Sequence, residues 1–425
     1  MPPVNHYNQT HVNFSPVACA RYNPTESGTN AKIKFPMKPY PVIADALRTM
    51  PYSRVREVAE IAFKMDGVLK LYFGESNQPT PEFIRNAVIQ ALTDGHTFYT
   101  PNAGTLALRS AIAAYYRRIH SVEIDPVSEV VVTASGVQAL NVAIRTVLNP
   151  GDEVIALTPA WPNAGTISAL SGAVVKEVAQ PLVGNRYQID FEALEAAVSP
   201  RTKLLVYTSP SNPLGWVATE RDQDMLLDFA RRHGIWLLAD EVYDRLYYEG
   251  NGTAPSMLKK ANRDDALLVV QSFSESYCMT GWRLGFVIAR SDAGQKIGQL
   301  NEYTISNAAA FTQRAGEVAL AEGEEHIRLQ LSRLRANRDY CLQAMREMPR
   351  LTVPDPTGAF YLFPKVEGLS DSLEFCKRLL REKLLGIAPG MAFGKGGEGS
   401  VRLCYAAEMD VLEPAMVRLS AFLQA

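Results

Sequence analysis

Between about residue 130 and residue 290 the sequence repeats one pattern, in which short β-branched runs alternate with longer stretches of helical periodicity. Alternation of this kind predicts an α/β fold with a mainly parallel sheet sandwiched by helices. Several runs are apolar almost throughout, as is typical of strands that are buried on both faces. The predicted strands are EVVVTAS, DEVIALT, AVVKEVA, TKLLVYTS, IWLLADE, ALLVVQS and LGFVIA.

The remaining parts of the chain predict a second domain and an N-terminal arm. A length of 425 residues exceeds the roughly 100–200 residues usual for one domain. We assign residues 75–305 to a large domain that contains the sheet, and residues 36–74 and 306–425 to a smaller α+β domain, because long helical patterns and short strands follow the sheet region. Residues 1–35 are polar and aperiodic, which indicates an arm that is flexible or ordered only against a partner subunit.

Composition and charge exclude several functional classes. The formal net charge is −2 and no dense Lys/Arg run occurs, so neither nucleic acid nor an anionic membrane is expected as a partner. No apolar stretch approaches the length of a membrane span, and the N-terminus carries no secretion signal. The five cysteines form no C-x-x-C pair, which fits neither a zinc site nor a disulfide framework. We therefore expect a cytoplasmic protein that binds a small molecule and no metal.

Candidate site residues follow the predicted strands, because ligands of such sheets bind at the carboxyl ends of strands. Ser135, Gly136 and Val137 form a small-residue turn that opens an apolar helix and suits a phosphate group, although such a turn can also be an ordinary helix cap. Trp161 can stack on a flat ring, and Asn212 can donate to a ring oxygen. Trp161 as ordinary core and N-P-L-G as an ordinary turn are the alternative interpretations.

Asp240 ends the strongly apolar run IWLLA and is therefore expected to be buried. A buried carboxylate needs a charged or hydrogen-bonding partner. A pyridinium nitrogen would be such a partner, and the ion pair would keep the ring protonated as an electron sink. A helix N-cap is the alternative interpretation of the same residue.

The stretch SFSESYCMTGWRLG, residues 272–285, resembles the cofactor-lysine signature of class I and II aminotransferases. That signature is S-x-S-K followed by G-W-R-x-G, with the lysine eight positions before the arginine. Glu275 stands eight positions before Arg283 and so occupies the place of the lysine. The resemblance covers most of the chain and continues, in the family's order, through LYFGESNQPTP, FYTPNAGTLALRSAI, ASGVQAL, PAWPNAG, SPSNPLG, ADEVY, TGAFYLF and GEGSVRL.

The resemblance implies a fold type I enzyme with a mainly parallel seven-stranded sheet and with pyridoxal or pyridoxamine 5′-phosphate as its cofactor. Its substrates would be an amino acid and a 2-oxo acid. The implied cofactor contacts are to the phosphate (Ser135, Gly136, Val137, Ser272 and Arg283), to the ring face (Trp161), to the ring nitrogen (Asp240) and to the phenolic oxygen (Asn212 and Tyr243).

Further implied contacts concern the substrate and a second subunit. Arg402 would hold the substrate α-carboxylate as a bidentate fork, helped by Asn212 and by the backbone at Gly74. A surface arginine is the alternative interpretation of Arg402. In the family a tyrosine of the neighbouring subunit reaches the cofactor phosphate, which implies this role for Tyr99 and hence a homodimer.

Glu275 is the departure from the family pattern. The family lysine holds the cofactor aldehyde as a Schiff base and then moves a proton during the reaction. A carboxylate cannot form that linkage, but it can act as a general base if its pKa is suitable. Glu275 is therefore predicted to be catalytic, together with Asp240 and Tyr243.

Three interpretations of Glu275 remain open at this stage. The chain can be an otherwise ordinary aminotransferase in which the lysine has been replaced, so that transamination is impaired. It can be a lysine-free enzyme that uses the same cofactor for a different reaction on an amino acid. It can also be a non-catalytic homologue that binds the cofactor.

Overall fold

The computed structural model describes residues 42–424. Contacts divide the chain into Met1–Ile43 and Ala44–Ala425, and every element named below belongs to the second unit. The predicted N-terminal arm, residues 1–35, lies outside the described residues. Among residues 42–424, no helix is both long and apolar enough to cross a membrane.

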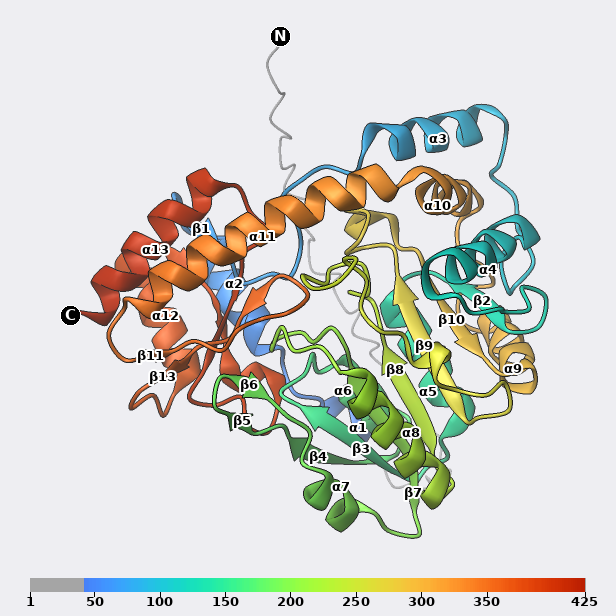
Figure 1. Ribbon diagram of the computed structural model, residues 1–425, viewed down its shortest axis with the longest axis horizontal. Helices are drawn as coiled ribbons and strands as arrows, with labels where there is room; N and C mark the ends of the chain where they lie inside the picture. The colour runs from blue at the N-terminus through green and yellow to red at the C-terminus, as the bar shows by residue number, and fades with distance from the viewer. Residues whose placement is uncertain (1–41, 425) are drawn as a thin grey trace, which may run out of the picture. The chain divides into compact units, whose positions relative to one another are not determined.

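A seven-stranded sheet lies within the unit Ala44–Ala425, with the strand order β2-β10-β9-β8-β7-β3-β4 (Figure 1). Neighbouring strands are parallel from β9 to β4, whereas β10 is antiparallel to both of its neighbours. Each predicted run forms one strand: β2 (Val130–Thr133), β3 (Glu153–Thr158), β4 (Val174–Ala179), β7 (Thr202–Thr208), β8 (Trp236–Asp240), β9 (Leu267–Ser272) and β10 (Gly285–Ala289). The predicted α/β class with a mainly parallel sheet is confirmed.

Helices follow the strands and pack on the sheet. α5 contacts β2, β9 and β10, and α8 contacts β8. α8 shows how local sequence sets these helices: Thr219 caps its first turn by accepting from the backbone N–H of Asp222, and Gly234 ends it at φ 61°. The helices of this region are α3 (Glu82–Thr93), α4 (Leu106–His120), α5 (Gly136–Val147), α6 (Asn163–Leu170), α7 (Phe191–Ala197), α8 (Glu220–His233), α9 (Ser291–Glu302) and α10 (Ala310–Glu322).

The C-terminal part combines long helices with short strands, as the sequence predicts. Its helices are α11 (Glu324–Arg346), α12 (Ser372–Lys383) and α13 (Met409–Leu423), and its strands are β11 (Leu351–Thr352), β12 (Tyr361–Leu362), β13 (Lys365–Val366), β14 (Leu385–Gly386), β15 (Ala388–Pro389) and β16 (Val401–Cys404). Strands β12, β16 and β15 form a three-stranded antiparallel sheet. The remaining short elements are α1 (Asp45–Arg48), β1 (Leu69–Lys70), β5 (Leu182–Val183), β6 (Arg186–Tyr187) and the 3-10 helices η1 (Met257–Lys259), η2 (Thr280–Trp282) and η3 (Gly390–Phe393).

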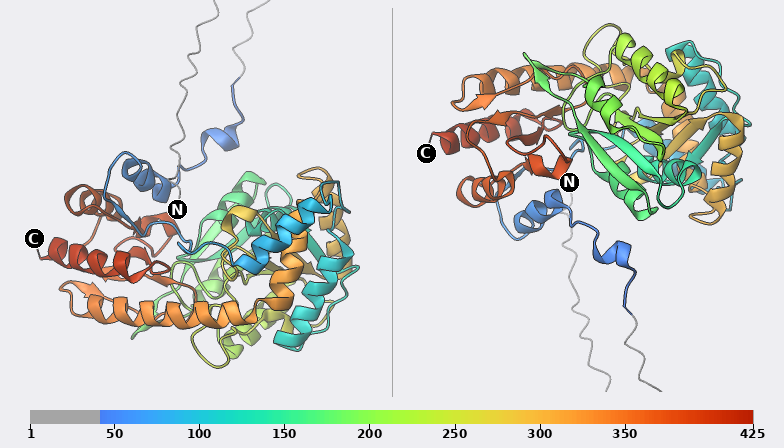
Figure 2. Two further views of the ribbon diagram at one scale, coloured as in Figure 1. Left: turned by 90° about the horizontal axis from the view of Figure 1, so that it is seen from above. Right: turned by 90° about the horizontal axis from the view of Figure 1, so that it is seen from below.

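Helix α2 (Arg54–Ala62) is the amphipathic helix expected before residue 75. It packs against α12, β14 and β15, which lie far along the sequence, and Figure 2 shows it beside the red and orange C-terminal elements. Strand β1 pairs in parallel with β14. The predicted domain boundaries at residues 75 and 305 stay a prediction, because contacts treat Ala44–Ala425 as one unit.

Candidate active site

The turn after β2 packs tightly against the ends of β9 and β10. A Cβ on Gly136 would lie 3.1 Å from the Cβ of Ser272, and one on Gly285 would lie 2.6 Å from the carbonyl carbon of Ser135. Ser135 has φ 104° and caps α5, since its Oγ accepts from the backbone N–H of Gln138 at 3.2 Å. The turn is thus a helix cap, and the first N–H groups of α5 still have no acceptor within the helix. Both features suit an anion at this position.

Asp240 is a half-buried carboxylate at the end of β8. Its carboxylate accepts one long hydrogen bond, from the backbone N–H of Val242 at 3.4 Å, and among the described residues no Lys, Arg or His pairs with it. Burial raises the pKa of Asp240 to about 7. The next helix along the chain is η1 (Met257–Lys259), so Asp240 caps no helix and the N-cap interpretation is wrong.

Glu275 lies close to the same group of side chains. Its Oε2 atom is buried and has no hydrogen-bond partner among the described residues. Burial raises the pKa of the Glu275 carboxyl to about 7; a hydrogen bond with Ser272 lowers it, and the charge of Asp240 raises it further. Burial is the main cause that raises the pKa values of Tyr243 and Tyr361, and the charge of the Glu275 carboxylate adds to both shifts.

Arg402, on β16, is fully buried, so the surface-arginine interpretation is wrong. Its Nη1 donates to Asn212 Oδ1 at 2.9 Å and its Nη2 donates to the carbonyl of Tyr72. Its Nε has no partner among the described residues. The guanidinium carbon lies 4.7 Å from the ring centroid of Tyr361 and 4.9 Å from that of Phe393. Aromatic rings therefore hold the guanidinium in place while one donor stays available.

A hydrogen-bond chain joins Arg402 to the tyrosines. The Asn212 amide nitrogen donates to Tyr243 Oη at 3.4 Å, and Tyr243 Oη lies 2.8 Å from Tyr361 Oη. A Cβ on Gly74 would overlap the Tyr361 hydroxyl, so only glycine fits there. The sequence interpretation missed Tyr361, although the quoted motif TGAFYLF contains it, because nothing in the motif marks its hydroxyl as part of a network.

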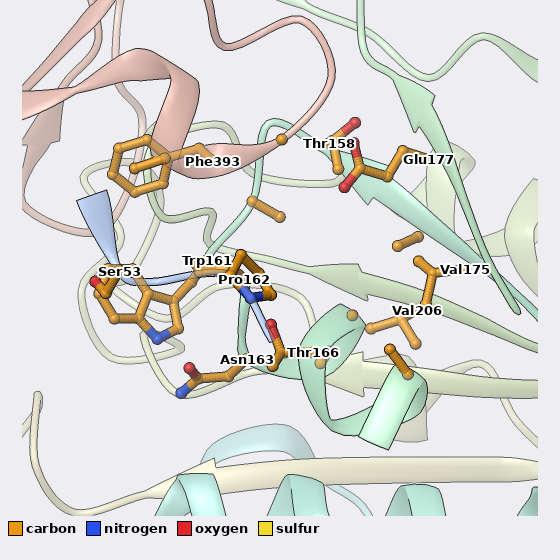
Figure 3. A pocket seen from close by; sticks show the side chains of 18 of the residues that line it. Ser53, Thr158, Trp161, Pro162, Asn163, Thr166, Val175, Glu177, Val206 and Phe393 are labelled. Atoms are coloured by element: carbon orange, nitrogen blue, oxygen red, sulfur yellow. The ribbon is translucent and has the colours of Figure 1, made fainter. Parts of the chain in front are cut away.

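A cavity of about 670 Å³ extends from Asp240 and Trp161 beneath α6, along β3, β4 and β7. Figure 3 shows Trp161 and Phe393 on one side of this cavity, and Glu177 and Val175 on the other. The backbone N–H of Trp161 donates to the Asn212 carbonyl at 3.0 Å, and the Arg402 guanidinium carbon lies 5.7 Å from the centroid of the Trp161 ring. Trp161 is partly exposed at the cavity wall, in contrast to the expectation for an ordinary core residue.

Three other predicted residues have exposed side chains, although the charge of Arg283 still lowers the pKa of Glu275. The Arg283 side chain is exposed, and its Nη1 donates to the Thr280 carbonyl at 2.7 Å. The side chain of Val137 is 47% exposed. Tyr99 lies in the connection between α3 and α4 and is 89% exposed, so this chain does not fold Tyr99 into its own site.

Comparisons with known proteins agree with this geometry. Residues 67–419 match the family model of aminotransferase class I and II. The chain belongs to this family. A class I and II aminotransferase that it resembles is the aspartate aminotransferase of Pyrococcus horikoshii, with 35% identity over 90% of this chain and 97% of the relative. Aromatic-amino-acid aminotransferase 2 of Thermococcus litoralis is 32% identical over 90% of this chain and 98% of its own.

Solved structures of the family share the fold. The aspartate aminotransferase of Thermus thermophilus with maleate has a TM-score of 0.84 and 30% identity, and the match covers 90% of this chain and 100% of that one. The resemblance inferred from motifs is therefore confirmed. Class I and II aminotransferases are enzymes that use pyridoxal 5′-phosphate, so the predicted enzyme class and cofactor are confirmed too.

The residues present fit a phosphorylated pyridine that is bound without a covalent bond. Asp240 can pair with a cationic ring nitrogen because no cationic side chain of the described residues pairs with it. The glycine at position 136 lets the first turn of α5 approach the Ser272 side chain closely, since a Cβ there would lie 3.1 Å from the Ser272 Cβ. Glu275 does not fit a covalent attachment, because a carboxylate cannot condense with an aldehyde as an amine does.

Proposed function

We propose that this class I and II aminotransferase binds pyridoxal or pyridoxamine phosphate non-covalently, acts on an amino acid and 2-oxo acid pair, and transaminates poorly because of Glu275. The observation that carries the proposal is Asp240, a half-buried carboxylate that finds no cation among the described residues. A buried charge without a partner is costly, so such a group is expected to pair with a ligand.

Each cofactor contact has a residue of this chain to make it. Ser135, Gly136 and Ser272 would hold the phosphate, with Val137 and Arg283 at its outer side. Trp161 would cover the ring, Asp240 would pair with its nitrogen, and Asn212 and Tyr243 would donate to its phenolic oxygen. When bound, the cofactor supplies an electron sink for the charge that develops at the substrate α-carbon.

Arg402 is the proposed substrate carboxylate site. A guanidinium pairs with a carboxylate through parallel N–H donors, and burial strengthens such a pair. Its unpartnered Nε and the glycine backbone at position 74 provide donors near Asn212. One relative is named for aspartate and another for aromatic amino acids. These substrates have only the α-amino and α-carboxyl groups in common, and all α-amino acids carry both groups. This supports an amino acid and 2-oxo acid pair without fixing the side chain.

A lysine-free enzyme is the second candidate function. The supporting observation is that burial brings the pKa of Glu275 to about 7, which suits a group that accepts and returns a proton near neutral pH. The charge of Glu275 also raises the pKa of Tyr243, which would act in the same reacting region. A non-catalytic binding protein would need the cofactor contacts but no such titrating group.

A homodimer is also part of the proposal. The supporting observation is that Tyr99 and Phe98 are 89% and 81% exposed in the connection between α3 and α4. A second copy would cover these rings and bring Tyr99 to the phosphate. A cytoplasmic location and a division into a large and a small domain stay predictions.

Equilibrium dialysis of the full chain against pyridoxal phosphate tests the cofactor proposal. Asp240→Ala removes the partner of the ring nitrogen, and affinity should fall about 10- to 100-fold, as expected for one charge-assisted hydrogen bond. Glu317→Gln is the control, since Glu317 is a partly buried carboxylate on α10 whose Oε1 has no partner among the described residues and whose Oε2 pairs with Arg314. Absence of binding to the unmodified chain would disprove the proposed function.

A further inference from the structure

The site contains more negative charge than a ring nitrogen can neutralise. Asp240 pairs in the sheet with Val270 of β9, five residues before Glu275, and the charge of Asp240 raises the pKa of the Glu275 carboxyl. Within residues 42–424, neither carboxylate forms an ion pair, and Glu275 Oε2 has no hydrogen-bond donor. One cationic ring nitrogen satisfies one of them and leaves the second unpaired.

The nearby cations are engaged elsewhere. Arg402 donates to Asn212 and to the Tyr72 carbonyl, and Arg283 donates to the Thr280 carbonyl from an exposed position. The charge of Arg283 lowers the pKa of Glu275, but Arg283 forms no ion pair with it. The other groups that face Glu275 are neutral hydroxyls and an amide: Ser272, Tyr243 and Tyr361, with Gln330 donating to the Glu275 backbone carbonyl at 3.1 Å. The Glu275 carboxylate can therefore form an ion pair only with a cation that the ligand supplies.

Two forms of the cofactor differ in this respect. Pyridoxamine phosphate carries a protonated aminomethyl group in addition to its ring nitrogen, whereas the aldehyde carbon of pyridoxal phosphate carries no charge. A dicationic pyridine matches two carboxylates, and a monocationic one leaves a buried carboxylate unpaired, which is costly. Glu275 cannot form the covalent linkage, but its carboxylate can pair with the protonated aminomethyl group of the amine form.

We infer that this chain preferentially holds pyridoxamine 5′-phosphate, without a covalent bond, with Asp240 paired to the ring nitrogen and Glu275 paired to the aminomethyl group. The inference rests on the proposed function, because it assumes that the cofactor binds at this site. Arg402 takes no part in the cofactor preference and stays available to a substrate carboxylate.

The test is calorimetric titration of the full chain, freed of cofactor, with each of the two forms at about pH 8. Charge-assisted hydrogen bonds shielded from water are strong enough that pyridoxamine phosphate should bind about tenfold more tightly, or better. Glu275→Gln should bring the ratio of the two dissociation constants close to one, mainly by weakening the amine form. The control Glu317→Gln should leave the ratio unchanged.

A second measurement needs no variant. The Glu275 carboxyl has a pKa near 7 in the unliganded site, so lowering the pH from about 8 to about 6 protonates it and should reduce the preference of the unmodified chain. Equal affinity for both forms at about pH 8, or a preference that Glu275→Gln leaves intact, overturns the inference while the proposed function stands. Binding of neither form refutes the proposed function itself.

Discussion

The two edges of the large sheet at which its parallel strands begin and end carry carboxylates with opposite electrostatics. Glu153 begins β3 and is 2% exposed, yet Lys176 Nζ lies 2.6 Å and Arg201 Nη2 2.7 Å from its carboxylate. A hydrogen bond from Lys176, followed by those from Ser199 and Arg201, lowers the pKa of Glu153 to about 2. At the other edge, where β8 and β9 end, burial raises the pKa values of Asp240 and Glu275 to about 7.

The difference lies in the partners, since Glu153, the most buried of the three carboxylates, has the lowest pKa. At the first edge the chain itself neutralises the charge, so the ion pairs belong to the folded structure. At the second edge the chain leaves Asp240 and Glu275 without cations, and carboxylates in that state are candidates for pairing with a ligand.

The largest effect is expected when the carboxylate at position 275 is replaced by a cationic amine. Glu275→Lys should create a linkage to pyridoxal phosphate that borohydride reduces, and it should raise amino-group transfer by about 10²–10⁴-fold, the usual contribution of a general acid–base group. Mass spectrometry after reduction and a transamination assay over a panel of amino acids measure the two effects. Glu275→Gln is the control and should do neither.

The outcome also separates the candidate functions. A Lys variant that forms the linkage yet transaminates nothing, beside an unmodified chain that turns over a substrate, would establish the lysine-free enzyme. Cofactor binding by both forms without any turnover would favour the non-catalytic protein.

A smaller effect is expected from an arginine at each edge. Arg402→Lys loses the bidentate fork, and the dissociation constant of a 2-oxo acid should rise about 10-fold or more in cofactor-loaded protein. Arg201→Lys, whose parent side chain is 70% exposed, is the comparison and should leave that constant unchanged. Equal losses in both variants would show that Arg402 does not contact the substrate. Fluorescence titration of the holo-protein provides the measurement.

Stability should depend on pH in opposite directions at the two edges. The folded pKa of Glu275 lies above its unfolded value, so its ionisation opposes folding as the pH rises through about 7. Glu275→Gln should therefore stabilise the ligand-free protein by roughly 2 kcal/mol at about pH 8 and by little at about pH 4. Urea unfolding at both pH values measures this.

For Glu153 the folded pKa lies below the unfolded value, so its contribution is present above the unfolded pKa and is lost as the pH falls toward about 2. Glu153→Gln should destabilise the protein at neutral pH and lose that effect in acid. The same sign for both Gln variants at neutral pH would remove the physical basis of the comparison.

The smallest effect is expected at Tyr99, whose side chain is exposed in this chain. Tyr99→Phe should weaken cofactor phosphate binding about fivefold, the value of one hydrogen bond at a solvent-accessible position, and leave the dimer intact in sedimentation experiments. Phe98→Tyr, a change in the neighbouring exposed ring, should leave the affinity unaltered. A monomer at micromolar concentration with cofactor bound would contradict the role of Tyr99.

Local sequence was sufficient for the elements of the fold. The runs predicted as strands form the seven-stranded sheet because a buried strand needs only a short β-branched apolar stretch, and helix caps such as Thr219 are local as well. The antiparallel placement of β10 was not predictable in this way, since strand direction depends on which distant strands pair.

For the site, the sequence by itself determined which residue types follow the strands, the register of Glu275 eight positions before Arg283, and the family. Only the tertiary structure decided whether Asp240 caps a helix, whether Arg402 is buried, and which phenols meet Asn212. The reason is that the charge of a carboxylate is compensated by side chains that are close in three dimensions and often distant in the sequence. A carboxylate lacks a cation only when every neighbour from every element has been placed around it, and no local pattern contains that information.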